Sequence, residues 1–171
     1  SDPNCPSGVR SLQRTVDALY LDEDLLIVHA DSLFECSISD FIEYAINKGT
    51  SCITRYYEKR MMVVQSSYAL NVSSKDEVID VLYKPFRSKT HWCIAPIYYV
   101  KRMDIPYISG KAIVDDDLGG LGNFVSWLCE NENIYAYEMK GKKYEISNLN
   151  SYEKIKKEFE PAAFNTAKTS E

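Results

Sequence analysis

The feature that most constrains the fold is a continuous apolar run from Leu25 to His29, which ends two residues before Asp31. Because the run shows no alternation of polar and apolar residues, it predicts a buried strand that is covered on both faces. Ligands of open α/β sheets bind beyond the carboxyl ends of the strands, and Asp31 follows such an end. The run therefore predicts an α/β domain in which Asp31 lies beside the ligand crevice.

Strand-like and helix-like segments alternate along the chain. Apolar spacing and turn residues predict a helix at 11–20, a strand at 25–29, a helix at 39–47 with Ser39 as its N-cap, strands at 51–57, 62–72, 77–83 and 93–100, an irregular stretch at 104–110 around Pro106, a helix at 121–129, strands at 134–139 and 144–146, and a helix at 149–159.

This alternation predicts a three-layer α/β fold with a mostly parallel, mixed sheet and helices on both faces. The strand–helix–strand unit from residue 25 to residue 57 is expected to be a right-handed, parallel crossover. We expect one domain over residues 1–160 and a polar, disordered tail over residues 161–171.

Composition and charge exclude several classes of protein. The formal charge is −5 and no block of like charge is present, so we expect no nucleic-acid partner and no membrane partner. The five cysteines are widely spaced and form no CxxC or Cys/His cluster. That spacing favours reduced thiols in a cytosolic protein over structural zinc or a disulfide scaffold. A nucleotide would need a local cationic pocket against this acidic background.

Asp31 leaves two interpretations open, and the spacing alone favours them equally. Its carboxylate is placed to hold a hard divalent cation at the crevice. Alternatively it caps the following loop by accepting hydrogen bonds from backbone N–H groups. His29, inside the apolar run, is interpreted as a satisfied core histidine, and the acidic run 115–117 as a solvated loop.

Five segments resemble, in the right order, motifs of the sugar-1-phosphate nucleotidyltransferase superfamily. Residues 24–34 resemble its strand followed by Gly-Asp-Asn, and residues 83–85 (Tyr-Lys-Pro) resemble its Glu-Lys-Pro motif. The other three segments are 93–98, similar to a strand that contains Thr-Gly-Ile-Tyr, 121–128, similar to a segment before the last strands, and 143–152, similar to Trp-Phe-Asp-Ile-Gly-Thr-Leu-Glu-Ser-Tyr. The resemblance covers residues 6 to 159 and implies a nucleotide-diphospho-sugar transferase-like fold.

The resemblance also implies an activity and roles for particular residues. In the family, a sugar 1-phosphate oxygen attacks the α-phosphate of a nucleoside triphosphate and displaces pyrophosphate. The partners implied are therefore a nucleoside triphosphate and a sugar 1-phosphate or other phosphorylated acceptor, with Mg²⁺ as the cofactor. The implied sites are catalytic Asp31 and Lys84, Mg²⁺ ligands Asp31 and Glu145, and substrate-binding Ser7, Gly8, Tyr83 and Pro96.

The chain also departs from the family pattern. The family's opening strand and its Gly-x-Gly-x-Arg loop are absent, so the fold is expected to be incomplete in its N-terminal half. Tyr83 replaces a sugar-binding Glu, Pro96 replaces a Gly, and Glu145 replaces an Asp. The alternative is thus a non-catalytic descendant that binds a sugar phosphate or a subunit. We expect a fragment, a split product or one member of an oligomer, because the Asp31 strand would otherwise expose an apolar edge.

Overall fold

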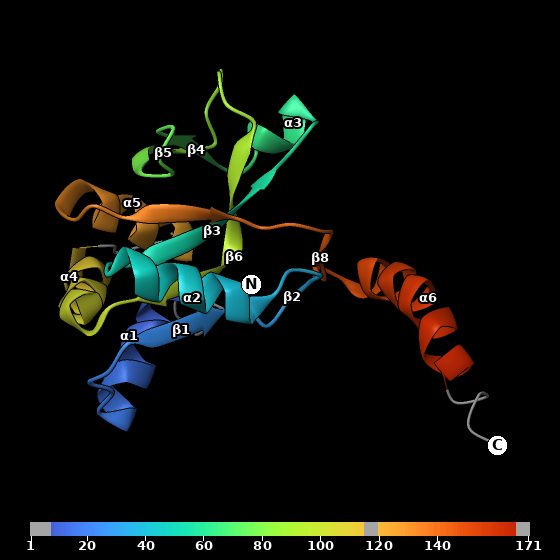
Figure 1. The fold of residues 1–171 in the computed structure, drawn as a ribbon, viewed down its shortest axis with the longest axis horizontal. Helices are drawn as coiled ribbons and strands as arrows, with labels where there is room; N and C mark the ends of the chain where they lie inside the picture. Colours follow the sequence, from blue (N-terminus) through green and yellow to red (C-terminus); the bar gives the residue numbers. More distant parts are fainter. Residues whose placement is uncertain (1–7, 115–119, 167–171) are drawn as a thin grey trace. The chain divides into compact units, whose positions relative to one another are not determined.

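The computed structural model describes residues 8–114 and 120–166, which fall into two units (Figure 1). The described part of unit 1 comprises residues 8–28, 37–114 and 120–139, and that of unit 2 comprises residues 29–36 and 140–166. The elements of unit 1 are α1 (Gly8–Leu19), β1 (Leu25–Val28), α2 (Ile38–Lys48), β3 (Cys52–Tyr57), α3 (Met61–Val64), β4 (Tyr68–Val72), β5 (Val78–Tyr83), β6 (Trp92–Val100), the 3₁₀ turn η1 (Arg102–Asp104), α4 (Ile105–Val114), α5 (Leu121–Asn131) and β7 (Tyr135–Glu138). Those of unit 2 are β2 (Ser32–Phe34), β8 (Lys143–Glu145) and α6 (Leu149–Thr166).

Unit 1 is built on a six-stranded mixed sheet in the order β5-β4-β6-β3-β7, with β1 also paired to β6. The expected α/β class is confirmed, but the mostly parallel sheet is not, because only β3 and β7 pair in parallel. β1 and β3 do run in the same direction, yet β6 lies between them and is antiparallel to both. An apolar run shows that a strand exists, but it carries no information on the direction of its neighbours.

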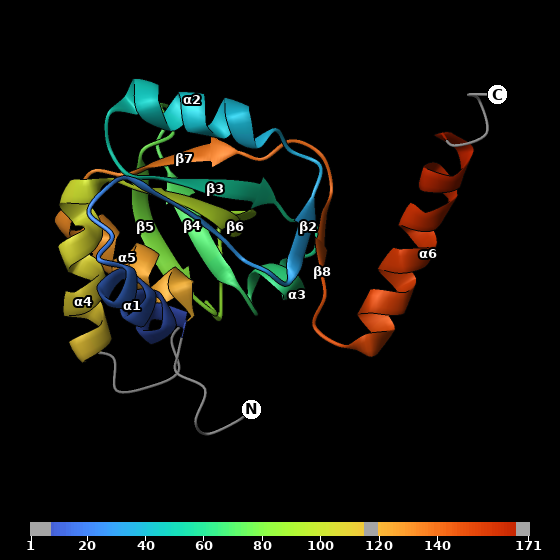
Figure 2. The ribbon, with the colours of Figure 1, turned by 90° about the horizontal axis from the view of Figure 1, so that it is seen from below.

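Helices cover the two faces of this sheet. One face packs with α1, α4 and α5 in a single apolar core that includes Val9, Ile53, Tyr98, Ile108 and Phe124. On the other face, α2 packs against β7, where the rings of Phe41 and Tyr44 lie 5.8 and 5.2 Å from that of Tyr137. Figure 2 shows α2 on one side of the sheet and α1 with α4 on the other.

β1 is half-covered, which corrects the prediction of a strand buried on both faces. Leu25 and Ile27 pack against the core, whereas Leu26 and Val28 are each 40% exposed. Among the described residues β1 pairs with β6 alone, so its second edge carries no ladder partner there. Although every residue of β1 is apolar, alternate residues face the core and the solvent, as in an ordinary half-buried strand.

Four local predictions differ from the structure. The N-cap of α2 is Ser37, not Ser39, because the Ser37 hydroxyl accepts the Asp40 backbone N–H at 3.2 Å. Residues 62–72 divide into helix α3 and strand β4. Residues 104–110 were expected to be irregular because of Pro106, but Pro106 lies in the first turn of α4, where a backbone N–H has no helical partner to lose. α6 extends to Thr166, past the start of the expected tail.

Pro96 is buried within β6, beside an irregularity in the ladder to β3. Proline has no N–H to give to the ladder, so the pairing must be completed in another way. The Thr54 hydroxyl donates to the Ile97 carbonyl at 3.0 Å and accepts the Ile97 N–H at 3.3 Å. A buried side chain thus replaces the missing main-chain bonds at this point of the sheet.

Asp24 fixes the start of β1 to the end of β6. Its carboxylate accepts hydrogen bonds from the Lys101 ammonium at 2.7 Å, the Tyr99 hydroxyl at 2.7 Å and the Arg102 backbone N–H at 2.8 Å. The Lys101 bond, followed by the Tyr99 bond, lowers the pKa of Asp24 to about 2. The ionised carboxylate is therefore part of the folded structure.

Replacing Asp24 with asparagine is expected to make stability less dependent on pH. Because the pKa of Asp24 is lower in the folded state, its stabilisation is complete above the ordinary value of 3.8 and is lost as the pH falls through about 2. After allowance for solvent screening, Asp24→Asn should lower the free energy of unfolding by about 1 kcal/mol at neutral pH. Urea unfolding as a function of pH measures this difference, which should shrink as the pH falls toward 2. The control is Asp22→Asn, which breaks an exposed pair with Arg102 and should lower the free energy of unfolding at neutral pH less than Asp24→Asn does.

The open edge of β1 is expected to cause self-association, because an unpaired apolar strand edge is a template for pairing with another chain. Sedimentation velocity of the chain should show an oligomer, and the double substitution Leu26→Lys with Val28→Lys should shift it to monomer. Ile46→Lys, at an exposed apolar position on α2, is the matched control and should leave the oligomer intact. A wild-type chain that stays monomeric at all concentrations contradicts this prediction.

Candidate functional site

A two-stranded antiparallel ribbon in unit 2 brings together two acidic residues that are far apart in the sequence. β2 pairs with β8 so that Ser32 faces Glu145 and Phe34 faces Lys143. The pairing continues beyond the strand ends, where the Ile146 N–H donates to the Asp31 carbonyl at 2.8 Å. Asp31 and Glu145 therefore come from neighbouring positions of one ribbon.

The Asp31 carboxylate is exposed and is held by the adjacent hydroxyl. The Ser32 Oγ donates to Asp31 Oδ1 at 3.1 Å. A capping role would instead require hydrogen bonds from backbone N–H groups of the following loop, and the described residues give Asp31 none. The carboxylate thus keeps most of its oxygen lone pairs available for a ligand.

Glu145 is also exposed, and the Lys143 ammonium lies 3.5 Å from its carboxylate. His29, half-buried at the start of unit 2, lies in the field of the same group of charges. Burial lowers the pKa of His29, while the charges of Asp31 and Glu145 act to raise it and Lys143 acts to lower it. Because burial is the larger effect, the pKa of His29 is lowered, and its imidazole is favoured in the neutral form.

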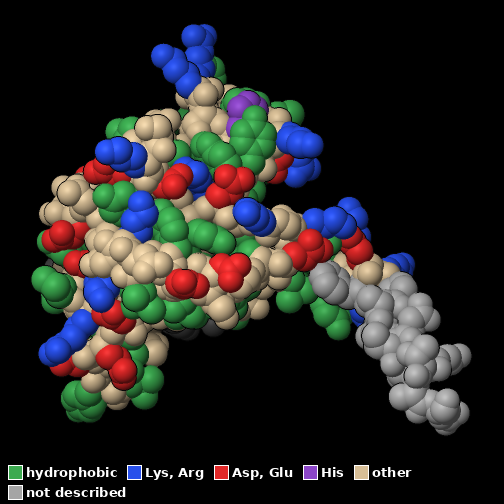
Figure 3. Space-filling view, viewed as in Figure 1, with side chains coloured by type: hydrophobic (Ala, Val, Ile, Leu, Met, Phe, Trp, Pro, Cys, Tyr) green, Lys and Arg blue, Asp and Glu red, His purple; other side chains and the backbone are tan. Residues whose placement is uncertain are grey.

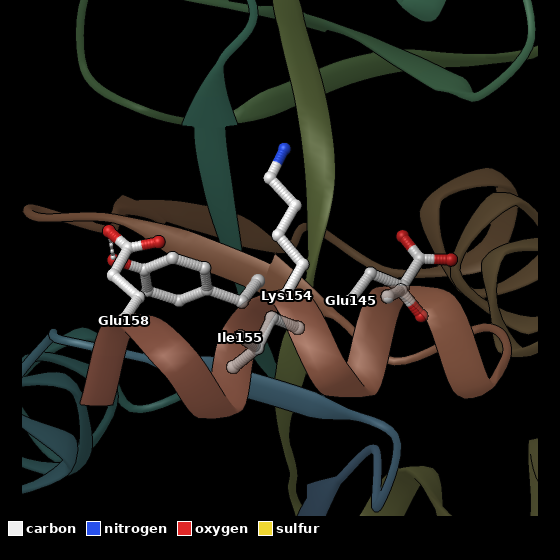
Figure 4. Close-up of a pocket in the computed structure, with 6 residues that line it drawn as sticks. Glu145, Lys154, Ile155 and Glu158 are labelled. Carbon is white, nitrogen blue, oxygen red and sulfur yellow. Dashed lines mark hydrogen bonds between the residues drawn. The ribbon is translucent and has the colours of Figure 1, made fainter. Parts of the chain in front are cut away.

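A shallow pocket of about 270 Å³ lies between β8 and α6. Its lining residues are Tyr144, Glu145, Ser151, Lys154, Ile155 and Glu158. Figure 4 shows Glu145 toward one end of the pocket and Glu158 toward the other, with Lys154 and Ile155 between them. The Tyr144 hydroxyl donates to Glu158 at 2.9 Å, and the Lys142 ammonium lies 3.0 Å from the same oxygen. The hydrogen bond from Lys142 lowers the pKa of Glu158, so its carboxylate stays ionised.

Lys154 is the one cation of this pocket and was not identified from the sequence. The sequence signal was the spacing of Ser151, Lys154 and Glu158, which places these side chains on one face of a helix. An ammonium near a carboxylate site is suited to receive a phosphate as a point charge. The pocket therefore combines Glu145 with a cationic group.

The start of α6 is fixed by reciprocal hydrogen bonds that hold the pocket residues in place. Asn148 Oδ1 accepts the Ser151 N–H at 2.9 Å, and Ser151 Oγ accepts the N–H groups of Ser147 and Asn148 at 3.0 Å each. This arrangement is a capping box, in which two unsatisfied donors of a helix start are bonded by side chains. It sets the direction in which α6 leaves β8.

The other residues suggested by the resemblance belong to unit 1 or lie outside the described residues. Tyr83 ends β5 and packs on Tyr68 with ring centroids 4.6 Å apart. Lys84 follows directly, has a φ of 45°, and extends its ammonium over the Tyr83 ring at 4.9 Å. Pro96 is buried in β6, and Gly8 begins α1. Ser7 and the acidic run 115–117 lie outside the described residues.

The candidate metal ligands of unit 2 are two carboxylates, those of Asp31 and Glu145. In the described ranges no group of three or more His, Cys, Asp or Glu side chains is placed to hold a metal ion. A dedicated all-protein cage, as for Ca²⁺ or Zn²⁺, is therefore not formed by these residues. Mg²⁺ is commonly bound by one or two carboxylates together with substrate phosphates, and Asp31 and Glu145 are exposed carboxylates of the kind that it uses. No helix in the described part is long and apolar enough to cross a membrane.

Comparison with solved structures relates this fold to a group of enzymes. The chain is similar to an apo UDP-glucose pyrophosphorylase, with a TM-score of 0.79 and 13% identity over 94% of this chain and 62% of that one. It is also similar to a UDP-glucose pyrophosphorylase complexed with UDP-glucose (TM-score 0.75, 16% identity, 92% and 63% covered) and to a UTP-bound UDP-glucose pyrophosphorylase from Acinetobacter baumannii (0.71, 12%, 88% and 55%).

These comparisons show a shared fold. No protein-family model and no curated protein matches the sequence. The chain spans less than two thirds of the length of the structures it resembles. The nucleotidyltransferase-like α/β fold expected from the five motifs is thus confirmed.

Replacing Ser151 with alanine is expected to loosen the first turn of α6, because two backbone N–H groups lose their acceptor. The loss of a helix cap costs about 1 kcal/mol, which corresponds to roughly fivefold faster amide exchange in that turn. Hydrogen exchange over residues 149–154 measures the effect. Ser147→Ala is the control, since the Ser147 hydroxyl accepts only the Asn148 side-chain N–H, at 3.4 Å. Equal exchange in both variants would contradict the capping role.

Proposed function

We propose that the chain carries the metal-binding and acceptor-binding part of a nucleotidyltransferase, which transfers a nucleoside monophosphate from a nucleoside triphosphate to a sugar 1-phosphate or related phosphorylated acceptor. The observation that carries this proposal is the pairing of β2 with β8, which brings Asp31 and Glu145 to neighbouring positions. Solved structures with the same fold include enzymes complexed with UTP and with UDP-glucose.

The proposed reaction places few demands on protein groups. An oxygen of the acceptor phosphate attacks the α-phosphorus, a new P–O bond forms, and the bond to the β-phosphate oxygen breaks to release pyrophosphate. Such a transfer depends on alignment and on neutralisation of negative charge, and needs no protein nucleophile. Asp31 and Glu145 would hold Mg²⁺, which neutralises phosphate charge when bound.

Cationic side chains supply the remaining charge in this proposal. Lys84 would face the acceptor phosphate, as the resemblance of residues 83–85 to the family's Glu-Lys-Pro motif implies. Lys154 would add a second ammonium near Glu145, because both line the same pocket. Each lysine acts as a point charge that binds and orients a phosphate.

The acceptor pocket is proposed to differ from that of ordinary hexose phosphates. Tyr83 presents a ring that is 53% exposed where the family has a carboxylate, and a ring cannot accept hydrogen bonds from several sugar hydroxyls. Pro96 is enclosed in β6, and its neighbour Ile97 is bonded to Thr54. A phosphorylated acceptor with fewer hydroxyl groups fits this surface better.

The second candidate is a non-catalytic descendant that binds a sugar phosphate or another subunit. The observation that favours it is the Lys143 ammonium, 3.5 Å from Glu145 and only 19% exposed. A partly buried cation at that distance competes with a metal ion for the carboxylate. This candidate predicts binding of a phosphorylated ligand without turnover.

The proposed activity is tested by Mg²⁺-dependent release of pyrophosphate across pairs of nucleoside triphosphates and phosphorylated acceptors, with UTP and glucose 1-phosphate as the first pair. We expect release with at least one pair, and a loss of about 100-fold for both Asp31→Asn and Glu145→Gln, because charge neutralisation by the metal contributes several kcal/mol. Glu153→Gln, an exposed acid on α6 outside the pocket, is the control and should remain active.

The outcomes separate the two candidates. No release with any pair, from a protein that still binds an acceptor phosphate in calorimetry, contradicts the transferase and supports the binding protein. Activity that Asp31→Asn leaves unchanged would show that the transferase does not use this ribbon.

A further inference from the structure

Two segments of unit 1 that are separated in the sequence lie side by side at one end of the sheet. The first follows β3 and includes α3, and the second is the loop between β5 and β6. Their exposed cationic and apolar residues, which we call the basic tip, are Lys59, Arg60, Met62, Lys84, Phe86, Arg87 and Lys89. Figure 1 shows the second segment as a yellow-green loop that extends past the end of the sheet beside α3.

Hydrogen bonds hold the two segments together. The Glu58 N–H donates to the His91 carbonyl at 2.9 Å, and the His91 ring lies 2.7 Å from the Glu58 carbonyl. The Gln65 side chain donates to the Phe86 carbonyl at 2.6 Å, and the Lys84 N–H donates to the Ser67 carbonyl at 2.9 Å. The basic tip is therefore a fixed surface of the fold and not a chance approach of two loops.

The charge of the basic tip is opposite to that of the whole chain. Five of its residues are Lys or Arg, while the chain has a net charge of −5. The two segments, 58–64 and 84–91, contain one carboxylate, that of Glu58, which is 13% exposed and bonded to Arg60. In Figure 3, Lys and Arg side chains gather at the top and upper right of the view, with hydrophobic and histidine side chains between them.

The apolar residues of the basic tip are among the most exposed in the described part. Phe86 is 87% exposed and Met62 is 84% exposed. The Arg87 guanidinium lies 5.9 Å from the Phe86 ring, so a cation flanks the apolar group. Exposing large apolar side chains to water is unfavourable unless another surface covers them.

We propose, against the expectation of no membrane partner drawn from the sequence, that the basic tip docks on the surface of an anionic phospholipid bilayer. Lys and Arg near a negatively charged leaflet each contribute to binding, and the apolar side chains beside them enter the boundary between headgroups and acyl chains. Charge complementarity and the projecting position of Phe86 favour this partner. A single-stranded nucleic acid would instead need a groove or sheet with several stacking rings, and Met62 is not a stacking group.

The proposal is tested by co-sedimentation of the full chain with vesicles of phosphatidylcholine alone and of phosphatidylcholine mixed with phosphatidylserine. Binding is expected only to the mixed vesicles. The double substitution Arg87→Gln with Lys89→Gln should weaken it roughly 30-fold, and Phe86→Ser should weaken it at least about tenfold. Lys84 is left unchanged because it belongs to the proposed catalytic site, so loss of vesicle binding and loss of transferase activity remain separate results.

Matched controls are available elsewhere on the chain. Lys140→Gln with Lys157→Gln removes the same charge at exposed positions of unit 2, and Met103→Ser removes an apolar group that is 83% exposed. Both should bind vesicles as the wild type does. Equal binding to both kinds of vesicle, or equal loss in the control variants, overturns the proposal. The proposal is also overturned if the chain binds neither kind of vesicle but binds polyuridylate, and the substitutions in the basic tip abolish that binding.

Discussion

The pairing of β6 on both of its sides is the interaction on which unit 1 depends. Tyr98 and Tyr99 face β1 across one ladder and β3 across the other, so one buried strand fixes the positions of segments from three parts of the chain. Thr54 completes this ladder beside Pro96, and Asp24 holds β1 at its far end. Because a ladder slip of one residue would turn every side chain to the opposite face, these contacts also fix which residues form the core.

The ribbon in unit 2 has the same role for the candidate site on a smaller scale. Few residues are paired, but their register determines that Asp31 and Glu145 are neighbours and that Glu145 lines the pocket with Lys154. The resemblance to nucleotidyltransferase motifs named both acids, and the structure places them at the same end of one ribbon. Lys154 could not be identified in advance, because the turn between β8 and α6 decides which face of the helix meets the pocket.

Sequence patterns predicted the positions of helices and strands more accurately than they predicted which strands pair and in which direction. The helices α1, α2 and α5 and the strands β1, β3 and β6 lie close to the predicted ranges, because periodicity and capping residues act locally. The direction of the sheet was predicted wrongly, because strand pairing is decided by residues distant in sequence. The prediction of an irregular stretch around Pro106 was also wrong. Proline is excluded from an interior position of a strand ladder but is well suited to the first turn of a helix. Likewise the cations of the basic tip form no block in the sequence.

The sequence by itself determined the α/β class, the acid that follows the first strand and the order of motifs that relates the chain to a known fold. These properties depend on residue type and short spacing, which act within a few turns or strand lengths. Only the tertiary structure decided that β1 is half-open, that Asp31 and Glu145 share a ribbon, and that Lys59 and Arg60 adjoin the loop of Phe86. The physical reason is that register and packing bring together groups separated by long stretches of chain, and no local pattern records that pairing.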